Sequence, residues 1–174
     1  MSRIEPARWI PVGVLGRPKG LQGAIWLRPF NEDIAALRVG LTVRLKREGL
    51  GEKVLAIATL SEDGKGITVT FSGERTREAA EALVLAEVSV RRSDLAPLAE
   101  GEFYHCDMPG APVLDRAGAV VGEVVEVIAY PSVDAVVVRT PKGDREVPMT
   151  ETFVVSVDAE SGVVLADGAL DDEA

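Results

Sequence analysis

A glycine-rich segment near the start of the chain, residues 12–23, carries the residues best suited to bind a ligand. Arg17, Lys19 and Arg28 place cations around the exposed backbone amides of this loop, a combination typical of phosphate sites. Gly20 and Gly23 can adopt backbone angles that other residues avoid, so the loop can approach a neighbour closely. We therefore predict that RNA is bound by Arg17, Lys19, Gly20, Gly23 and Arg28. A hairpin that carries ordinary surface cations is the alternative.

Two familiar phosphate-binding motifs do not fit this segment. A P-loop would require Gly-Lys-Ser/Thr, which does not follow these glycines. A dinucleotide fingerprint opens a helix, whereas Pro18 lies inside this loop and no helical pattern begins after Gly23. The segment therefore predicts a strand, a tight loop and a second strand, with a positive φ at Gly20.

The only histidine and the only cysteine are neighbours, His105 and Cys106, followed by Asp107. A nucleophile and its base must lie within hydrogen-bond reach, but neighbours on an extended strand point to opposite faces. We therefore predict no catalytic residues, with Cys106 as a small buried apolar side chain and His105 at a domain edge. One Cys and one His form neither an internal disulfide nor a Cys/His zinc cluster, so no metal and no cofactor is expected. A site built from carboxylates alone stays open.

The charge of the chain is unevenly distributed. The 174 residues are 47% hydrophobic and carry a formal net charge of -9. Residues 1–95 hold 15 Lys and Arg against 12 Asp and Glu, whereas residues 96–174 hold 4 against 16. We expect any RNA contact in the first half and a basic protein partner for the second, since counterion release needs clustered cations. With no long apolar segment, a cytoplasmic protein without membrane contact is expected.

Alternating apolar residues, punctuated by Gly, Pro, Asn and Asp, predict a mainly β protein. We expect two small β-barrels joined by a short linker, with two or three short helices. The predicted domains are 1–94, a linker at 95–101, a second barrel over 102–170 and an acidic tail at 171–174. Predicted helices cover 31–37 and, capped by Thr76, 77–83. Strands are predicted near 9–17, 22–30, 40–48, 52–60, 65–72, 86–92, 111–115, 119–129, 133–139, 144–148, 153–158 and 163–167.

Two adjacent aromatic residues, Phe103 and Tyr104, open the acidic half of a chain that is only 5% aromatic. In an extended segment they point in opposite directions, so one can anchor the barrel while the other faces a partner. A tyrosine at a domain junction is a reasonable anchor for a bound protein. An aromatic pair that only packs the linker is the alternative.

Several short motifs follow one another in a fixed order along residues 9–167. They are Val12-Gly13-Val14, Gly20-Leu21-Gln22-Gly23, Arg28-Pro29-Phe30-Asn31, the helical segment 77–83, Glu102-Phe103-Tyr104, Val113-Leu114-Asp115, Gly122-Glu123-Val124, Val147-Pro148 and Val157-Asp158. In this order they resemble the family of the bacterial ribosome maturation factor RimM. The resemblance covers almost the whole chain.

The resemblance implies a non-enzymatic assembly factor built from a six-stranded N-terminal barrel and a C-terminal PRC barrel. It implies binding to the head of the immature small ribosomal subunit, contact with the head ribosomal protein numbered nineteen, and promotion of small-subunit ribosomal RNA processing. The aromatic pair of the family is implicated in ribosomal-protein contact, so Phe103, Tyr104 and His105 are the expected protein-binding residues. A monomer is expected. The competing hypothesis is a PRC-barrel interaction module with a non-ribosomal partner.

The chain departs from the family pattern at three places. After the predicted second helix, Val84 and Leu85 replace the usual Arg-Gly, which removes a cation and a turn glycine. The usual Tyr-Tyr-Trp is Phe103-Tyr104-His105, and Met108-Pro109 replaces the usual Leu-Ile. We therefore transfer no role for the missing arginine, and expect a weaker or differently aimed contact at the aromatic pair.

Overall fold

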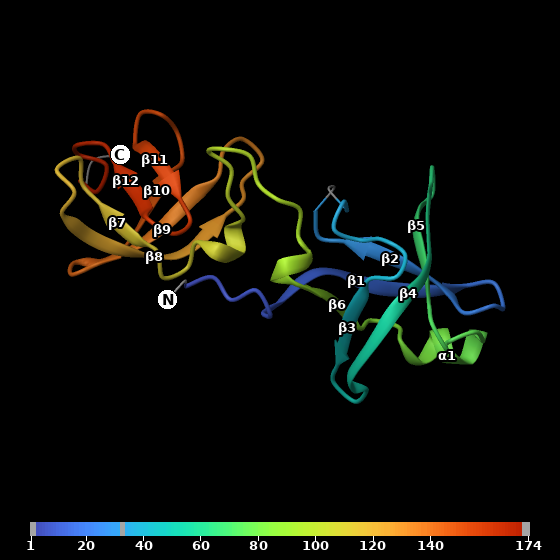
Figure 1. The fold of residues 1–174 in the computed structure, drawn as a ribbon. Coiled ribbons are helices and arrows are strands. Elements are labelled where there is room, and N and C mark those ends of the chain that lie inside the picture. Colours follow the sequence, from blue (N-terminus) through green and yellow to red (C-terminus); the bar gives the residue numbers. More distant parts are fainter. Residues whose placement is uncertain (1–2, 32–33, 172–174) are drawn as a thin grey trace. The chain divides into compact units, whose positions relative to one another are not determined.

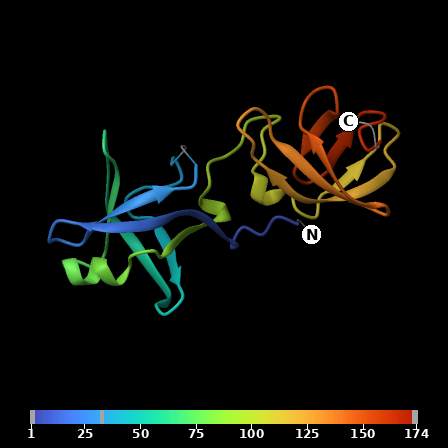
Figure 2. The same cartoon turned by 180° about the vertical axis from the view of Figure 1, so that it is seen from behind.

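The computed structural model describes residues 3–31 and 34–171, which divide into two compact units (Figures 1 and 2). One unit comprises residues 5–96, and the other combines residues 3–4 with 97–171. This division falls within the predicted linker, but Arg3 and Ile4 group with the C-terminal unit rather than with the predicted domain 1–94. Residues 172–174 of the predicted acidic tail lie outside the described residues.

Six strands of the first unit form a closed barrel in the order β1-β2-β5-β4-β3-β6, with antiparallel neighbours. Each predicted strand of this half has a counterpart with shifted ends, so the mainly β prediction is confirmed. The strands are β1 (Trp9–Lys19), β2 (Ala24–Pro29), β3 (Thr42–Arg47), β4 (Gly51–Asp63), β5 (Gly66–Phe71) and β6 (Glu87–Arg91).

Alternation along the strands separates the core of this barrel from its outer face. On β2, Ile25 and Leu27 are buried, whereas Arg28 is exposed and Trp26 half-buried. Burial of such apolar side chains stabilises the barrel by about 1.5–3 kcal/mol each. Because Ile25 and Leu27 point inward, Trp26 and Arg28 share the outer face. The largest fully buried side chains of the unit are Leu15, Ile25, Val43, Leu45, Ile57, Val69, Phe71, Leu83, Val88 and Val90.

The helix α1 (Arg77–Ala82) lies beside the hairpin of β1 and β2, as both views show (Figures 1 and 2). The backbone N–H of Ala79 donates to Thr76 Oγ1 at 3.1 Å, which confirms the predicted cap. Ala80 and Leu83 are buried and fix the helix against the barrel. This packing holds α1 next to the glycine-rich loop.

The predicted helix over 31–37 is wrong. Its two acids, Glu32 and Asp33, lie outside the described residues, and residues 34–37 form a turn in which the Leu37 N–H donates to the Ile34 carbonyl at 2.8 Å. Leu37 and Leu41 are both buried in the barrel core. A helix as short as the predicted one is marginal without tertiary support, so the burial of Leu37 and Leu41 decides the conformation of this segment.

Leu85 is the one non-glycine residue with a positive φ among those described, at 65°. Its N–H donates to the carbonyl of Leu15 at 2.9 Å, and its side chain is exposed. A turn position that favours glycine is thus occupied here by leucine. The left-handed conformation costs a residue with a Cβ about 1 kcal/mol.

The second unit is a barrel-like sheet of six strands in the order β10-β9-β8-β7-β12-β11. β7 and β12 are parallel, and the other neighbours are antiparallel. At Gly122 on β8, an added Cβ would lie 2.6 Å from the Arg139 carbonyl oxygen, so only glycine allows β9 to approach this closely. The strands are β7 (Pro112–Leu114), β8 (Val120–Ile128), β9 (Ala135–Thr140), β10 (Gly143–Pro148), β11 (Val154–Asp158) and β12 (Gly162–Leu165).

Two single 3-10 turns complete the helical content of the described chain, η1 (Arg92–Asp94) and η2 (His105–Asp107). In residues 3–31 and 34–171 no helix has the length and apolar character needed to cross a bilayer.

Arg3 belongs to the C-terminal unit through its guanidinium group. That group donates to the backbone carbonyls of Asp107, Pro109 and Ala159, at 2.7 Å for Pro109. Gly110 leaves room for it, since a Cβ there would lie 3.3 Å from Arg3 Cδ. A planar guanidinium offers five N–H donors, which suits three converging carbonyls.

Candidate functional site

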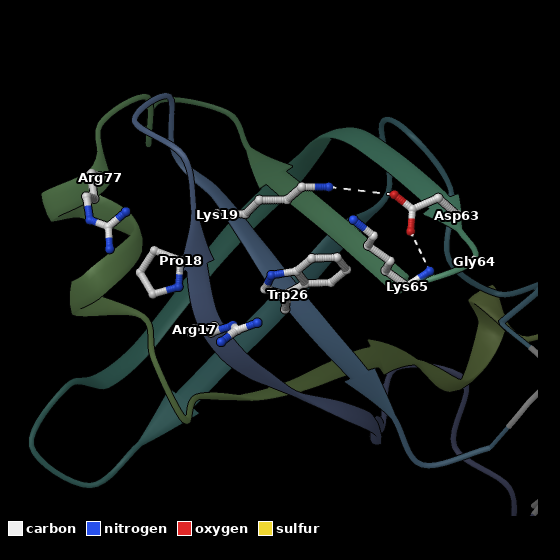
Figure 3. A pocket seen from close by; sticks show the side chains of 8 residues that line it. All are labelled: Arg17, Pro18, Lys19, Trp26, Asp63, Gly64, Lys65 and Arg77. Carbon is white, nitrogen blue, oxygen red and sulfur yellow. Dashed lines mark hydrogen bonds and ion pairs between the residues drawn. The ribbon is translucent and has the colours of Figure 1, made fainter.

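Four cations from three parts of the first unit line one hollow together with Trp26 (Figure 3). Arg17 and Lys19 come from β1, Lys65 follows the end of β4, and Arg77 comes from α1. They line a hollow of about 960 Å³ whose full lining is Arg17, Pro18, Lys19, Trp26, Asp63, Gly64, Lys65 and Arg77. Positive charge is therefore concentrated beside the glycine-rich loop.

Lys19 lies over the indole of Trp26, with Nζ 4.6 Å from the ring centroid. A cation over an aromatic face is attracted by the ring quadrupole, by about 0.5–1 kcal/mol at exposed sites. Lys19 Nζ is also 3.7 Å from Asp63 Oδ2, but both side chains are nearly half exposed, so water screens the pair. The other oxygen, Asp63 Oδ1, accepts the backbone N–H of Lys65 at 2.7 Å. Asp63 thus orders the turn that carries Lys65.

A second hollow of about 920 Å³ adjoins the first and shares Arg17, Trp26 and Lys65 with it. It adds Arg28, which follows Trp26 by two positions on the outer face of β2. Glu62 contributes one acid to its lining. The predicted cations Arg17, Lys19 and Arg28 therefore share one face with Trp26, and we call this set, with Lys65 and Arg77, the Trp26 face.

The two glycines of the predicted site shape the loop in different ways. Gly20 has a φ of 69°, which confirms the prediction, and its carbonyl accepts a hydrogen bond from Arg77 Nη1 at 3.0 Å. Gly23 has a φ of 85°, and a Cβ there would lie 2.1 Å from the Glu74 carbonyl oxygen. The close approach thus belongs to Gly23, whereas Gly20 has nothing within 4 Å of its missing Cβ.

Trp26, Lys65 and Arg77 are absent from the predicted site. The signal for Trp26 is present in the sequence, because buried Ile25 and Leu27 on either side place it on the same face as Arg28. Lys65 and Arg77 carry no such signal. Their proximity depends on the pairing of β5 with β2 and on the packing of α1.

The cations of β3 lie apart from the Trp26 face. The guanidinium carbon of Arg44, on β3, lies 5.4 Å from the ring centroid of Trp9, and that of Arg91, on the neighbouring strand β6, lies 4.7 Å from it. Arg47 Nη1 donates to the carbonyl of Val84. Arg44 and Arg47 therefore support the structure of the barrel, and the basic residues of the first half form more than one group.

In the second unit, the predicted extended conformation of the His105 segment is wrong, because residues 105–107 form the 3-10 turn η2. His105 Nε2 lies 2.8 Å from Asp134 Oδ2, and its ring stacks on Phe103 with centroids 5.8 Å apart. The Cys106 Sγ instead donates to Asp107 Oδ1 at 3.8 Å. Cys106 is half-buried rather than buried as predicted, and Asp107 is fully buried. His105 therefore contacts Asp134, whereas Cys106 contacts Asp107.

Phe103 packs against the core of the second unit and borders a hollow of about 480 Å³. Tyr104 is half-buried, and its carbonyl accepts the N–H of Asp107 at 3.0 Å. Phe103 thus packs on the core, whereas the partner contact of the pair stays a prediction. The remaining lining of the hollow comes from Gly101, Asp134, Met149, Thr150, Glu151 and residues 154–157.

The titratable residues of the described chain do not form a metal centre. Within residues 3–31 and 34–171, no three of His, Cys, Asp and Glu are placed to hold one ion. The arrangement on the Trp26 face, with cations around an aromatic ring, is suited to an anionic ligand that carries flat groups.

The family model described as the RimM N-terminal domain matches residues 10–95, and the one described as the RimM PRC barrel domain matches residues 105–171. This chain belongs to the RimM family. The Ribosome maturation factor RimM of Sorangium cellulosum (strain So ce56) is 43% identical over 160 residues, which cover 90% of this chain and 93% of that one. The RimM of Rhodopseudomonas palustris (strain BisB18) is 34% identical over 162 residues, covering 92% and 90%.

A solved structure, the N-terminal domain of RimM from Thermus thermophilus, is 32% identical and covers 53% of this chain and 99% of that chain, with a TM-score of 0.43. The RimM resemblance seen in the sequence is confirmed by the family models and relatives. The first RimM model spans β1 to β6 except for Trp9, and the second begins at His105, just after Phe103 and Tyr104.

Proposed function

We propose that this chain binds the immature small ribosomal subunit near its head and promotes its maturation and the processing of its RNA. The observation that carries the proposal is the convergence of Arg17, Lys19 and Arg28 with Lys65 and Arg77 around Trp26. Clustered cations that neutralise phosphates release counterions, and this release drives binding to RNA. The curated relatives bear the name Ribosome maturation factor, which agrees with this role.

The second unit supplies the protein contact in this proposal. Residues 96–174 hold 16 acids against 4 Lys and Arg, so they attract a basic protein, for which we propose the head ribosomal protein numbered nineteen. Phe103, Tyr104 and His105 form the proposed contact, next to the hollow that Phe103 borders. The 2.8 Å contact of His105 Nε2 with Asp134 Oδ2 holds the imidazole in place beside that hollow.

No bond is broken by the chain in this mechanism. A protein that binds one conformer of the subunit head more tightly than another by about 1.4 kcal/mol shifts their ratio tenfold. We propose that the chain acts in this way, as a monomer in the cytoplasm, and that purified protein leaves precursor RNA uncleaved.

Co-sedimentation with immature small subunits over a range of salt concentrations tests the RNA contact. The double variant Arg17→Ala/Lys19→Ala should bind more weakly, with the slope of log affinity against log salt reduced by about 2. The matched control Arg38→Ala/Lys46→Ala removes the same charge from residues outside the two hollows, and should keep the slope. Equal slopes for both double variants would reject the role of the Trp26 face.

The competing function, an interaction module with a non-ribosomal partner, makes a different prediction in the same assay. It predicts no salt-sensitive association of the unaltered chain with immature subunits, even at low salt.

A further inference from the structure

Two glycines, Gly16 and Gly66, lie next to the side chain of Trp26. A Cβ on Gly66 would lie 3.3 Å from Trp26 Cζ3, and a Cβ on Gly16 would lie 3.5 Å from Trp26 Cβ. The indole therefore lies against glycine backbone on the outside of the barrel. Trp26 lines both hollows of the Trp26 face, and Figure 3 shows it among the residues that line the first.

Cations line both hollows that Trp26 borders. Arg17 and Lys65 line both hollows, Arg77 lines the first and Arg28 the second. The Lys19 ammonium lies over the ring, and its ion pair with Asp63 is long, at 3.7 Å. Because the Lys19 side chain is also 45% exposed, this pair is weak and the ammonium can move to a phosphate. An aromatic platform within a group of cations is an arrangement by which proteins hold single-stranded nucleic acid.

We propose that Trp26 stacks on an unpaired RNA base while the surrounding cations contact the phosphates on either side of that base. The inference rests on the proposed RNA contact and adds that the ligand is single-stranded. In a duplex the faces of the bases are covered by their neighbours, whereas loops, bulges and ends can offer one to a side chain. A Trp26 that only shields the backbone of Gly66 is the opposing interpretation.

Fluorescence can isolate this residue, because the chain has two tryptophans, Trp9 and Trp26. In a Trp9→Phe variant all indole emission comes from Trp26. Titration with a short single-stranded oligoadenylate should quench that emission, and an RNA duplex of the same length should quench it far less. In the matched Trp26→Phe variant all indole emission comes from Trp9, which lies near Arg44 and Arg91 and outside the Trp26 face. This emission should stay unchanged.

Binding is measured separately, by anisotropy of labelled RNA. Trp26→Leu should weaken oligoadenylate binding roughly tenfold, and Trp26→Phe should keep most of it, because stacking is worth about 1–3 kcal/mol per base. Circular dichroism shows whether Trp26→Leu is folded; if it is not, quenching in the folded Trp9→Phe variant decides.

Three results would overturn the stacking. They are oligoadenylate binding without quenching, equal quenching of Trp9 and Trp26, and tighter binding of the duplex. If Arg17→Ala/Lys19→Ala still weakens subunit binding in any of these cases, the proposed RNA contact stands and only the stacking fails. Absence of binding to both RNAs at low salt, together with an unchanged subunit salt slope, would overturn both.

Discussion

Gly23 lies so close to Glu74 that a Cβ at position 23 would come within 2.1 Å of the Glu74 carbonyl oxygen. Gly23→Ala must therefore move the loop away from residue 74 as well as strain a φ of 85°. We expect a loss of about 3 kcal/mol in the free energy of unfolding, from overpacking and the left-handed backbone together. Denaturant unfolding of the purified variant measures it.

Gly20→Ala is the matched comparison for this loop. Its φ of 69° is also left-handed, but an added Cβ meets nothing within 4 Å. We expect a loss of only about 1 kcal/mol. A Gly20→Ala variant as unstable as Gly23→Ala would contradict the separate roles of the two glycines.

Leu85→Gly should stabilise the first unit. The substitution removes a Cβ from a residue with a φ of 65° and deletes a side chain that is 61% exposed. The relief of backbone strain exceeds the added entropy of glycine in the unfolded chain, and we expect a net gain of about 0.5–1 kcal/mol. The melting temperature measures the gain, and a decrease would show that the exposed leucine contributes packing.

Arg3→Ala should destabilise the C-terminal unit although residue 3 lies ahead of the first barrel. The change deletes the donors for the carbonyls of Asp107, Pro109 and Ala159. The expected loss is about 1–2 kcal/mol, since water can reach part of this site. Arg3→Lys should recover only part of it, because an ammonium lacks the planar fork. Hydrogen exchange at residues 105–111 and 157–161 should rise in the alanine variant and stay level elsewhere.

Asp158 should give the second unit a pH-dependent contribution to stability. Hydrogen bonds from the backbone N–H and the hydroxyl of Ser161, then from the N–H of Glu160, hold the pKa of the Asp158 carboxyl below its ordinary value of 3.8. The carboxylate is therefore favoured by folding, and its stabilisation is present above pH 3.8 and is lost as the pH falls through the lowered pKa.

The variant Asp158→Ala should consequently have a lower melting temperature at neutral pH, and the difference should shrink as the pH falls below 3.8 and through the lowered pKa. Asp158→Asn keeps an acceptor oxygen that does not titrate, so its difference should vary less with pH. Calorimetry over this range checks both variants. A constant difference for Asp158→Ala would mean that the ionised carboxylate is not the stabilising form.

The aromatic pair offers a separation of packing from binding. Phe103 is partly buried against the second core, so Phe103→Ala should lower the free energy of unfolding by about 2 kcal/mol. Tyr104→Ala should mainly weaken binding to the basic ribosomal protein. Thermal unfolding and pull-down assays on both variants distinguish the two effects, and a larger stability loss for Tyr104→Ala would assign that residue to the core.

The mainly β fold and the helix α1 could be predicted from the sequence, because period-two alternation and the Thr76 cap are local signals. The prediction of a helix over 31–37 failed because the burial of Leu37 and Leu41 in the barrel is a long-range effect. The extended conformation predicted for the His105 segment failed for a similar reason. His105 reaches Asp134, 29 positions away, and no local pattern announces that pair.

The candidate site was predicted in part. The predicted loop cations and Arg28 do lie on one face, since β1 and β2 are neighbouring strands of one hairpin, as the strand–loop–strand pattern predicts. Lys65 and Arg77 reach the same face through the turn after β4 and through α1, which only the closed barrel brings near Trp26. Trp26 could have been found from the alternation on β2 alone.

The anchorage of Arg3 determines how the two halves of the chain can be separated and labelled. A fragment that starts at Pro97 would lack the guanidinium on which three of its carbonyls depend, so it is not equivalent to the same residues in the full chain. A fluorophore attached next to Arg3 would report on the C-terminal unit, although the barrel of residues 5–96 follows it in the chain. Probes for the Trp26 face therefore belong within residues 5–96 and outside the two hollows, not next to Arg3.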